Sequence, residues 1–339
     1  MSEGPLRVLD RLPEGILEAP AGEMEALLGG PTLLLLEGER PAPLLVSTLL
    51  HGNEITGLEA LQRVLREHFR DGAPRLPRTL AWFIGNVRAA RSGVRRLPEQ
   101  RDFNRVWPGT SAPDSAETRM AAEVVARMRS LGCFASIDIH NNTGVNPHYA
   151  CVNVLAGPYL QLAALFSRTV VYFTRPRGVQ SMAMARVAPA VTVECGQSGS
   201  PGAAEHAADF IRSALHLSRL PEAIPRDISV FHTVGAMRVP PEVSFGFGES
   251  DADLRFPEHL ERMNFQELPS GTCLAHVRAG SSGYLSVEDN AGREAAAEFF
   301  YRDGDALRLR LPAMPAMLTC DRTAIRQDVL GYLMERYAL

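Results

Sequence analysis

The sequence of 339 residues contains no lysine, and all 35 of its basic side chains other than histidine are arginine. This absence excludes Schiff-base chemistry on lysine, pyridoxal phosphate enzymes among it, and phosphate-binding loops that end in Gly-Lys-Ser or Gly-Lys-Thr. No G-x-G-x-x-G pattern follows an early strand, which argues against a nicotinamide-dependent dehydrogenase. The formal net charge of −4 argues against nucleic acid as the main partner, because phosphate binding requires a clustered basic surface.

Cysteines are few and long apolar runs are missing. The five cysteines are widely spaced and form no C-x-x-C pair, which is typical of a reducing compartment. Acidic residues at Asp10, Glu14 and Glu18 do not fit a signal peptide, and the longest apolar runs have the length of strands rather than of membrane spans. We therefore expect a cytoplasmic protein with no membrane partner, and self-association stays open.

Short β-rich runs alternate with helical patterns over the first two thirds of the chain. This alternation predicts an α/β fold: a mostly parallel, mixed sheet with helices on both faces. The expected strands are Thr32–Leu36, Leu44–Leu50, Thr79–Ile84, Phe134–Ile139, Tyr149–Leu155, Thr169–Phe173 and Ala190–Glu194. The expected helices are Ile55–Phe69, Ala116–Leu131, Pro158–Ser167 and Ala203–Leu217. In such sheets, ligands bind beyond the carboxyl ends of the strands.

The pattern changes after Pro221. Residues 226–339 are rich in proline, glycine and short alternating runs, which indicates a smaller, β-rich domain. We therefore expect a first domain over residues 1–225 and a second over residues 226–339. Strands are expected at Ile228–Val234, Cys273–Arg278, Tyr284–Val287 and Ala306–Leu311, and a last helix at Thr323–Arg336.

Two groups of polar residues follow strands in the first domain. His51-Gly52-Asn53-Glu54 comes after Leu44–Leu50, and a histidine and a glutamate three residues apart can both point at one ion, with Gly52 allowing a tight turn. Taken alone, the pair also fits a strand-end histidine and a helix N-terminal glutamate. Asp138-Ile139-His140 ends the strand Phe134–Ile139, so Asp138 and His140 share one side of it. Asp138 could therefore orient a metal-ligating imidazole.

Glu194-Cys195-Gly196 follows another apolar strand. A carboxylate at the end of a buried strand is costly unless it has a partner or a task. An ion pair with one of the many arginines would satisfy it, and so would a catalytic role. No neighbouring residue provides a base for a Cys195 nucleophile. The segment from Gly196 to Ser200 also fails the G-x-S-x-G pattern, because its second glycine falls one place early.

An arginine-rich connection lies between the strand ending at Ile84 and the helix from Ala116. Connections of this length are usually functional or disordered. Most of its arginines also fit a solvated loop. Asn104-Arg105 is different, because a planar guanidinium beside an amide suits bidentate capture of a carboxylate.

Together these residues predict a catalytic metal site. His51, Glu54 and His140 form the two-histidine, one-carboxylate set of a catalytic Zn²⁺, with one position open for water. Glu194 would then be the general base that takes the proton of the water, and arginines of the loop would stabilise an oxyanion. We expect one Zn²⁺ per chain.

Four motifs, in this order, resemble the succinylglutamate desuccinylase/aspartoacylase family, a branch of the zinc carboxypeptidase-like hydrolases. They are His51-x-x-Glu54, Asp102-Phe103-Asn104-Arg105, Asp138-Ile139-His140-Asn141 and Glu194-x-Gly196. The resemblance implies the zinc carboxypeptidase-like fold, zinc bound by His51, Glu54 and His140, and Glu194 as general base. It also implies that Asn104 and Arg105 hold a substrate carboxylate.

The resemblance also implies two further arginines. One precedes the Asp-x-Asn-Arg motif and polarises the scissile carbonyl; we assign it to Arg96, with Arg95 and Arg101 as alternatives because the spacing is one residue longer than expected. The other precedes the base and binds a second substrate carboxylate, for which Arg186 and Arg177 are the candidates. The sequence also departs from the family in having phenylalanine instead of leucine at position 103 and in a C-terminal region that matches only loosely.

We therefore predict a zinc-dependent hydrolase that cleaves the amide bond of a small N-acyl amino acid. One alternative keeps the site and makes the protein a metallocarboxypeptidase that acts on short peptides. Another is a catalytically inactive metal-binding protein, against which the presence of all the ligands and the base argues.

Overall fold

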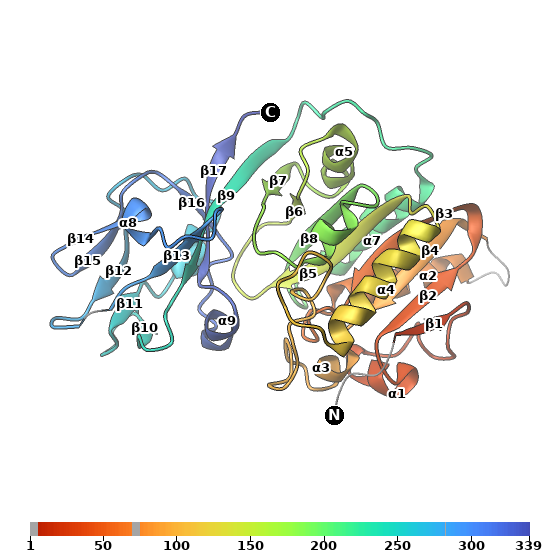
Figure 1. Cartoon of the computed structure of the whole chain (residues 1–339), viewed down its shortest axis with the longest axis horizontal. Helices are drawn as coiled ribbons and strands as arrows, with labels where there is room; N and C mark the ends of the chain where they lie inside the picture. The colour runs from red at the N-terminus through yellow and green to blue at the C-terminus, as the bar shows by residue number, and fades with distance from the viewer. Residues whose placement is uncertain (1–5, 70–74, 282) are drawn as a thin grey trace. The chain divides into compact units, whose positions relative to one another are not determined.

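The computed structural model describes residues 6–69, 75–281 and 283–339 (Figure 1). Contacts between residues divide the chain into two compact units. The first unit comprises the chain up to Asn141 together with His148–Ser229, and the second comprises Asn142–Pro147 and Val230–Leu339. The expected division into domains of residues 1–225 and 226–339 stays a prediction.

A mixed sheet forms the centre of the first unit. Within the first unit, the strands of this sheet lie in the spatial order β1 (Arg7–Leu9), β2 (Thr32–Leu36), β4 (Leu76–Ile84), β3 (Gly38–Thr48), β5 (Ala135–Asn142), β8 (Ala190–Gln197), β6 (Tyr149–Val152) and β7 (Thr169–Tyr172). β3 runs parallel to both β4 and β5, whereas β2 is antiparallel to β4 and β6 is antiparallel to β8. This is the mixed α/β sheet that the alternation of strands and helices predicts.

Helices connect these strands (Figure 1). They are α1 (Met24–Leu28), α2 (Thr56–Phe69), α3 (Val87–Arg91), α4 (Ala116–Ser130), α5 (Gly157–Phe166), α6 (Gln180–Met184) and α7 (Ala203–His216), with a 3-10 helix at Ala21–Glu23. The apolar side chains of α4, such as Met120 and Val124, pack in one cluster with Leu45 and Phe83 of the sheet. On α2 the predicted apolar face is buried except at its ends, where Phe69 is exposed and Ile55 lies outside the helix.

Burial on both faces of the sheet explains the continuous apolar strands of the sequence. Every residue of β5 is buried, and so are Leu44–Thr48 at the end of β3. A strand covered on one side only would alternate between buried and exposed residues. Helices therefore cover both faces, as predicted, and the polar side chains of these strands have to find partners inside the protein.

The second unit consists mainly of antiparallel strands. β9 (Ser229–Arg238) pairs with β13 (Ser286–Asp289) and with β17 (Gly331–Tyr337), which also pairs with β16 (Met314–Ala316). A separate five-stranded sheet contains β10 (Phe245–Phe247), β11 (Leu254–Phe256), β12 (Cys273–Val277), β15 (Ala306–Leu309) and β14 (Phe300–Asp303). The short helices are α8 (Ala296–Phe299), α9 (Arg322–Gln327) and a 3-10 helix at Leu260–Met263.

The predicted helix over Thr323–Arg336 is wrong in its second half. α9 ends at Gln327, and the chain continues as β17, in which Leu333 and Met334 are fully buried. β17 forms backbone hydrogen bonds with β9 and β16. Pairing with two distant strands thus outweighs the weak local helical pattern.

Candidate metal centre

The tight turn after β3 carries His51 and Glu54. Its backbone closes with the N–H of Glu54 donating to the carbonyl of His51 at 3.1 Å, and α2 begins two residues later. Gly52 lies against α3, where a β-carbon would come within 2.2 Å of the backbone nitrogen of Ala90. Close approach of two backbones therefore explains the glycine between the two polar residues.

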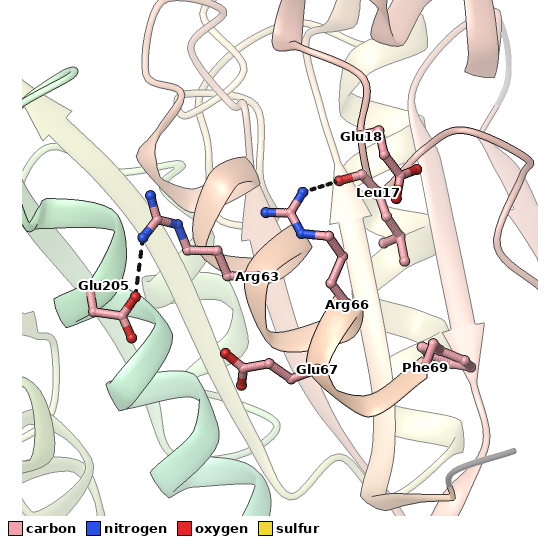
Figure 2. Close-up of a pocket in the computed structure, with 7 residues that line it drawn as sticks. All are labelled: Leu17, Glu18, Arg63, Arg66, Glu67, Phe69 and Glu205. Atoms are coloured by element: carbon pink, nitrogen blue, oxygen red, sulfur yellow. Dashed lines mark hydrogen bonds and ion pairs between the residues drawn. The ribbon is translucent and has the colours of Figure 1, made fainter. Parts of the chain in front are cut away.

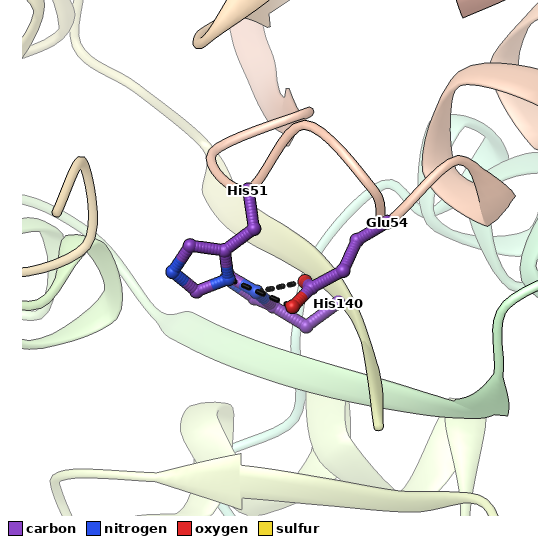
Figure 3. Close-up of side chains that lie close together, drawn as sticks. All are labelled: His51, Glu54 and His140. Atoms are coloured by element: carbon purple, nitrogen blue, oxygen red, sulfur yellow. Dashed lines mark hydrogen bonds and ion pairs between the residues drawn. The ribbon is translucent and has the colours of Figure 1, made fainter. Parts of the chain in front are cut away.

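His51, Glu54 and His140 converge, although His140 lies on β5 (Figure 3). The Nδ1 atom of His51 is 2.8 Å from Glu54 Oε1, and that of His140 is 2.7 Å from Glu54 Oε2. One ligand atom from each residue lies within 4.8 Å of the others. All three side chains are buried.

A second carboxylate holds the far side of each imidazole. Asp102 Oδ1 accepts from Nε2 of His51 at 3.0 Å, and Asp138 Oδ2 accepts from Nε2 of His140 at 2.9 Å. Carboxylates in this position fix the tautomer and the orientation of metal-ligating histidines. Both rings therefore present Nδ1 as the ligand atom. The contact of Asp138 is the one expected from the Asp-x-His spacing.

Neighbouring charges within the cluster shift the pKa values of its side chains. Burial opposes the charged form of Glu54, but both histidines outweigh it and hold the pKa of this carboxyl well below its usual range. Burial likewise opposes charge on His140, but Asp138 and Glu54 raise its pKa well above the usual value. The cluster thus has two buried carboxylates, Glu54 and Asp138, and a partly buried third, Asp102, arranged around two imidazoles.

This donor set fits a divalent metal ion. Two imidazole nitrogens and one carboxylate oxygen are the protein ligands of a catalytic Zn²⁺ with an open position. The ligand atoms face one another and the opposite ring nitrogens are already occupied. The same donors can hold other divalent ions, so the geometry supports a metal and the ligand types favour zinc.

Glu194 lies near the carboxyl end of β8 and is buried. Burial raises the pKa of its carboxyl to about 7; His140 lowers this value and Glu54 raises it. The charge of Glu194 therefore couples to the cluster. A carboxyl that titrates near neutral pH is suited to accept and return a proton.

The arginine loop brings Arg95, rather than Arg96, into contact with the cluster. Two guanidinium nitrogens of Arg95 donate to Asp102 Oδ2 at 3.2 and 2.9 Å, and Nη1 lies 3.8 Å from Glu54 Oε1. Arg96 donates to the carbonyl of Gln100 at 3.1 Å. The role of Arg96 as the residue that polarises the carbonyl stays a prediction.

Asn104 and Arg105 follow Asp102 directly. The side chain of Asn104 is buried, with Nδ2 3.1 Å from Nε2 of His140 and Oδ1 accepting from the backbone N–H of Gln180 at 2.8 Å. Arg105 is partly buried and donates to the carbonyl of Asn104. Their predicted contact with a substrate carboxylate stays a prediction.

Arg186 follows α6 and is exposed, with its guanidinium group beside Gly109. The structure thus brings the three predicted ligands and Asp138 together, and electrostatics link Glu194 to them. The substrate-binding role of Arg186 stays a prediction.

Sequence reasoning missed the contacts that several residues make around the ligands. Asp102 is 51 positions from the histidine it holds, so no local spacing reveals the pair. Asn141 donates to Thr56 and to the carbonyl of Gly196, which links the ends of β5 and β8 to the start of α2. Gln180 belongs to a helix too short for its periodicity to be noticed.

A pocket on the surface of the first unit is a poorer candidate site (Figure 2). It has a volume of about 620 Å³ and is lined by residues of α2 with Leu17, Glu18 and Glu205. Arg63 pairs with Glu205 at 3.1 Å, and Arg66 donates to the carbonyl of Leu17 at 2.6 Å. These arginines thus bind groups of the chain itself, and the cluster of His51, Glu54 and His140 is the better candidate.

Fold and donor set together define an α/β protein with two histidines and one carboxylate that can hold a metal ion. The model of the succinylglutamate desuccinylase/aspartoacylase catalytic domain matches residues 42–219, a segment that contains all the ligands and Glu194. This is more than half of the chain, which therefore belongs to the succinylglutamate desuccinylase/aspartoacylase family. Comparison with curated proteins gives no match.

Solved structures show the same fold. The succinylglutamate desuccinylase of Chromobacterium violaceum is 18% identical, with a TM-score of 0.55, and the match covers 88% of this chain and 86% of that one. The corresponding enzyme of Vibrio parahaemolyticus is 15% identical, with a TM-score of 0.58 and coverages of 88% and 83%. Murine aminoacylase 3 is 14% identical, with a TM-score of 0.53 and coverages of 88% and 96%.

Proposed function

We propose that the protein is a zinc-dependent hydrolase that cleaves the amide bond of a small N-acyl amino acid. The observation that carries this proposal is the convergence of His51 Nδ1, His140 Nδ1 and the carboxylate of Glu54, with both Nε2 atoms held by aspartates. Membership in a family named for desuccinylase and aspartoacylase supports the substrate class.

A zinc ion bound there would lower the pKa of a water molecule towards about 7 and polarise a substrate carbonyl. In this proposal, Glu194 takes a proton from the attacking water and returns it to the leaving amine. Its burial and its pKa of about 7 support both halves of that role.

Arginines supply the remaining positive charge. In this proposal, Arg105 and Asn104 hold the carboxylate of the amino acid, because a guanidinium group and an amide match its two oxygens. Arg96 stabilises the oxyanion, while Arg95 holds Asp102 and through it His51. Arg186 is the candidate for a second carboxylate on an acidic acyl group.

All five cysteines are free, which supports a reducing compartment such as the cytoplasm. None of the helices formed by the described residues is long and apolar enough to span a bilayer.

The test is a hydrolysis screen of N-acetyl, N-formyl and N-succinyl amino acids with zinc-loaded protein, measured as release of the free amine. Glu194→Gln should keep stoichiometric zinc and lose turnover by about 10²–10⁴-fold. Glu249→Gln is the matched control, because Glu249 is exposed in the second unit.

Two results would overturn the proposal. A wild-type protein that binds no stoichiometric zinc lacks the predicted centre. A zinc-loaded protein that cleaves short peptides from their carboxyl terminus, and none of the N-acyl amino acids, is instead a metallocarboxypeptidase.

A further inference from the structure

Gln180 is a fully buried amide in the apolar layer between the sheet and its covering helices. It is the first residue of α6, and none of its surface is exposed. Its side-chain Nε2 donates to Ser47 Oγ at 3.0 Å and to Ser136 Oγ at 2.8 Å. A buried amide is costly unless it is hydrogen-bonded, so this position requires an explanation beyond filling space.

The two serines lie on the strands that carry the metal ligands. Ser47 is on β3, four residues before His51, and Ser136 is on β5, four residues before His140. These strands are parallel neighbours, with Leu45 opposite Ser136 and Ser47 opposite Asp138. Gln180 therefore bridges the two strands at positions four residues before each of the two histidines.

The polar residues share one face of the sheet. Side chains alternate along a strand, so Ser136, Asp138 and His140 all point to the same side of β5. Residues opposite one another in a sheet also point to the same side, which places Ser47 with them. α6 covers this face, since its Ala183 and Met184 pack with Leu45.

The backbone of Gln180 reaches a third segment. Its N–H, which has no partner within the first turn of a helix, donates to Asn104 Oδ1 at 2.8 Å. Asn104 Nδ2 in turn lies 3.1 Å from Nε2 of His140 and 3.5 Å from Asp138 Oδ2. One residue thus connects β3, β5 and the loop that carries Asp102 and Asn104.

We propose that Gln180 is a positioning residue of the metal centre, which sets the separation of His51 and His140 by joining their two strands to each other and to Asn104. The proposal rests on the proposed function only in taking these histidines as zinc ligands. It assigns no contact between Gln180 and substrate.

Gln180→Met tests it, because methionine has nearly the same length and removes the side-chain hydrogen bonds while keeping the backbone N–H. The zinc dissociation constant, measured by competition with a chromophoric chelator, should rise about tenfold, the lower end for groups that support metal ligands. The absorption bands of the cobalt-substituted protein should shift, because they report ligand geometry.

Gln62→Met is the matched control. Gln62 is also buried, on α2, and its Nε2 also donates to two acceptors, the carbonyls of Ile16 and Ala19, at 2.8 and 2.7 Å. Because these acceptors belong to the N-terminal segment, Gln62→Met should destabilise the fold without changing zinc affinity by more than about twofold or moving the cobalt bands. If Gln180 had a purely structural role, Gln180→Met and Gln62→Met would have the same zinc affinity and the same cobalt bands.

The double variant Ser47→Ala with Ser136→Ala keeps the inference testable if Gln180→Met does not fold. It removes the same two hydrogen bonds from the other side, so it should weaken zinc binding to the same extent. A zinc affinity and a cobalt spectrum that match wild type in either folded variant would overturn the inference while leaving the proposed function intact. A wild-type protein without zinc would overturn both.

Discussion

Gly52 lies between His51 and Glu54, the two candidate metal ligands of the first motif, and its replacement by alanine tests how the turn is built. A β-carbon on Gly52 would lie 2.2 Å from the nitrogen of Ala90 and 2.3 Å from the carbonyl carbon of Ala89. Both atoms belong to the backbone of α3, so no flexible side chain can move aside. Ordinary contacts of a β-carbon begin at 3.4 Å, and α3 or the turn would have to shift by about 1.2 Å.

The expected cost follows from two terms. Overpacking of this kind costs about 1–3 kcal/mol. The shift also weakens the hydrogen bond from Gly52 N–H to the carbonyl of Arg95, which contributes about 1 kcal/mol. Alanine recovers about 0.4–1 kcal/mol through the unfolded state, which leaves a net loss of about 1–4 kcal/mol. For a unit of this size, the loss corresponds to a fall in Tm of about 2–15 °C.

Urea unfolding followed by tryptophan fluorescence measures this loss. Both tryptophans of the chain, Trp82 and Trp107, are fully buried in the first unit, so their emission reports that unit alone. Gly22→Ala is the control, because a β-carbon at Gly22 meets no atom within 4 Å and the backbone there has no positive φ. Its free energy of unfolding should stay within about 1 kcal/mol of the wild type.

The turn also carries His51 and Glu54, so Gly52→Ala should weaken zinc binding in the molecules that still fold. If the free energy of unfolding of this variant stays within about 0.5 kcal/mol of the wild type, the range of a neutral surface change, the described packing of the turn on α3 is refuted. Unchanged zinc affinity in a destabilised variant would refute only the link between the turn and the ligands.

Three further predictions concern the surroundings of the ligands and the thiols. Asp138→Asn should weaken zinc binding about 10–100-fold, whereas Asp251→Asn should leave it unchanged, because Asp251 is 94% exposed in the second unit; equilibrium dialysis with zinc compares them. Arg96→Ala should lower kcat with normal zinc affinity, whereas Arg95→Ala should also lower zinc affinity because it releases Asp102; equal zinc affinities would contradict this division. Iodoacetamide at pH 8 followed by mass spectrometry should label only the two partly exposed cysteines of the native protein. The three buried thiols should stay unlabelled because burial keeps them protonated: it raises the pKa of Cys133 to about 11 and the pKa values of Cys151 and Cys195 well above the usual value.

Local pattern was sufficient for most of the first unit. The strand Thr32–Leu36 is confirmed residue for residue, and the helices over α2 and α4 are confirmed to within one residue at each end. These elements have long apolar runs or a clear helical period, so the sequence and the packing favour the same structure. The second unit gives weaker signals, and there the last predicted helix is wrong beyond Gln327.

The convergence of His51, Glu54 and His140 could be predicted for a related reason. His51 and Glu54 lie in the turn that follows β3, and His140 lies near the end of β5; the carboxyl ends of these parallel strands meet at one edge of the sheet. Asp138 could be found as well, because it shares a strand and a face with His140. The order of the motifs also indicated a resemblance to the family. The match over residues 42–219 confirms this resemblance.

The residues that hold the ligands could not be predicted from local pattern. Asp102 reaches His51 across 51 positions, and Gln180 reaches Ser136 across 44 and Ser47 across 133. No periodicity encodes these pairs, because each arises only when the sheet brings the loop, α6 and two strands together. Buried serines in apolar strands are a local trace: Ser47 and Thr48 interrupt one apolar run, and Ser136 and Asp138 interrupt the other. A polar residue at such a place needs a hydrogen-bond partner from another segment. In this fold the partner lies on the covering helix α6, which joins β3 and β5 next to the proposed metal centre.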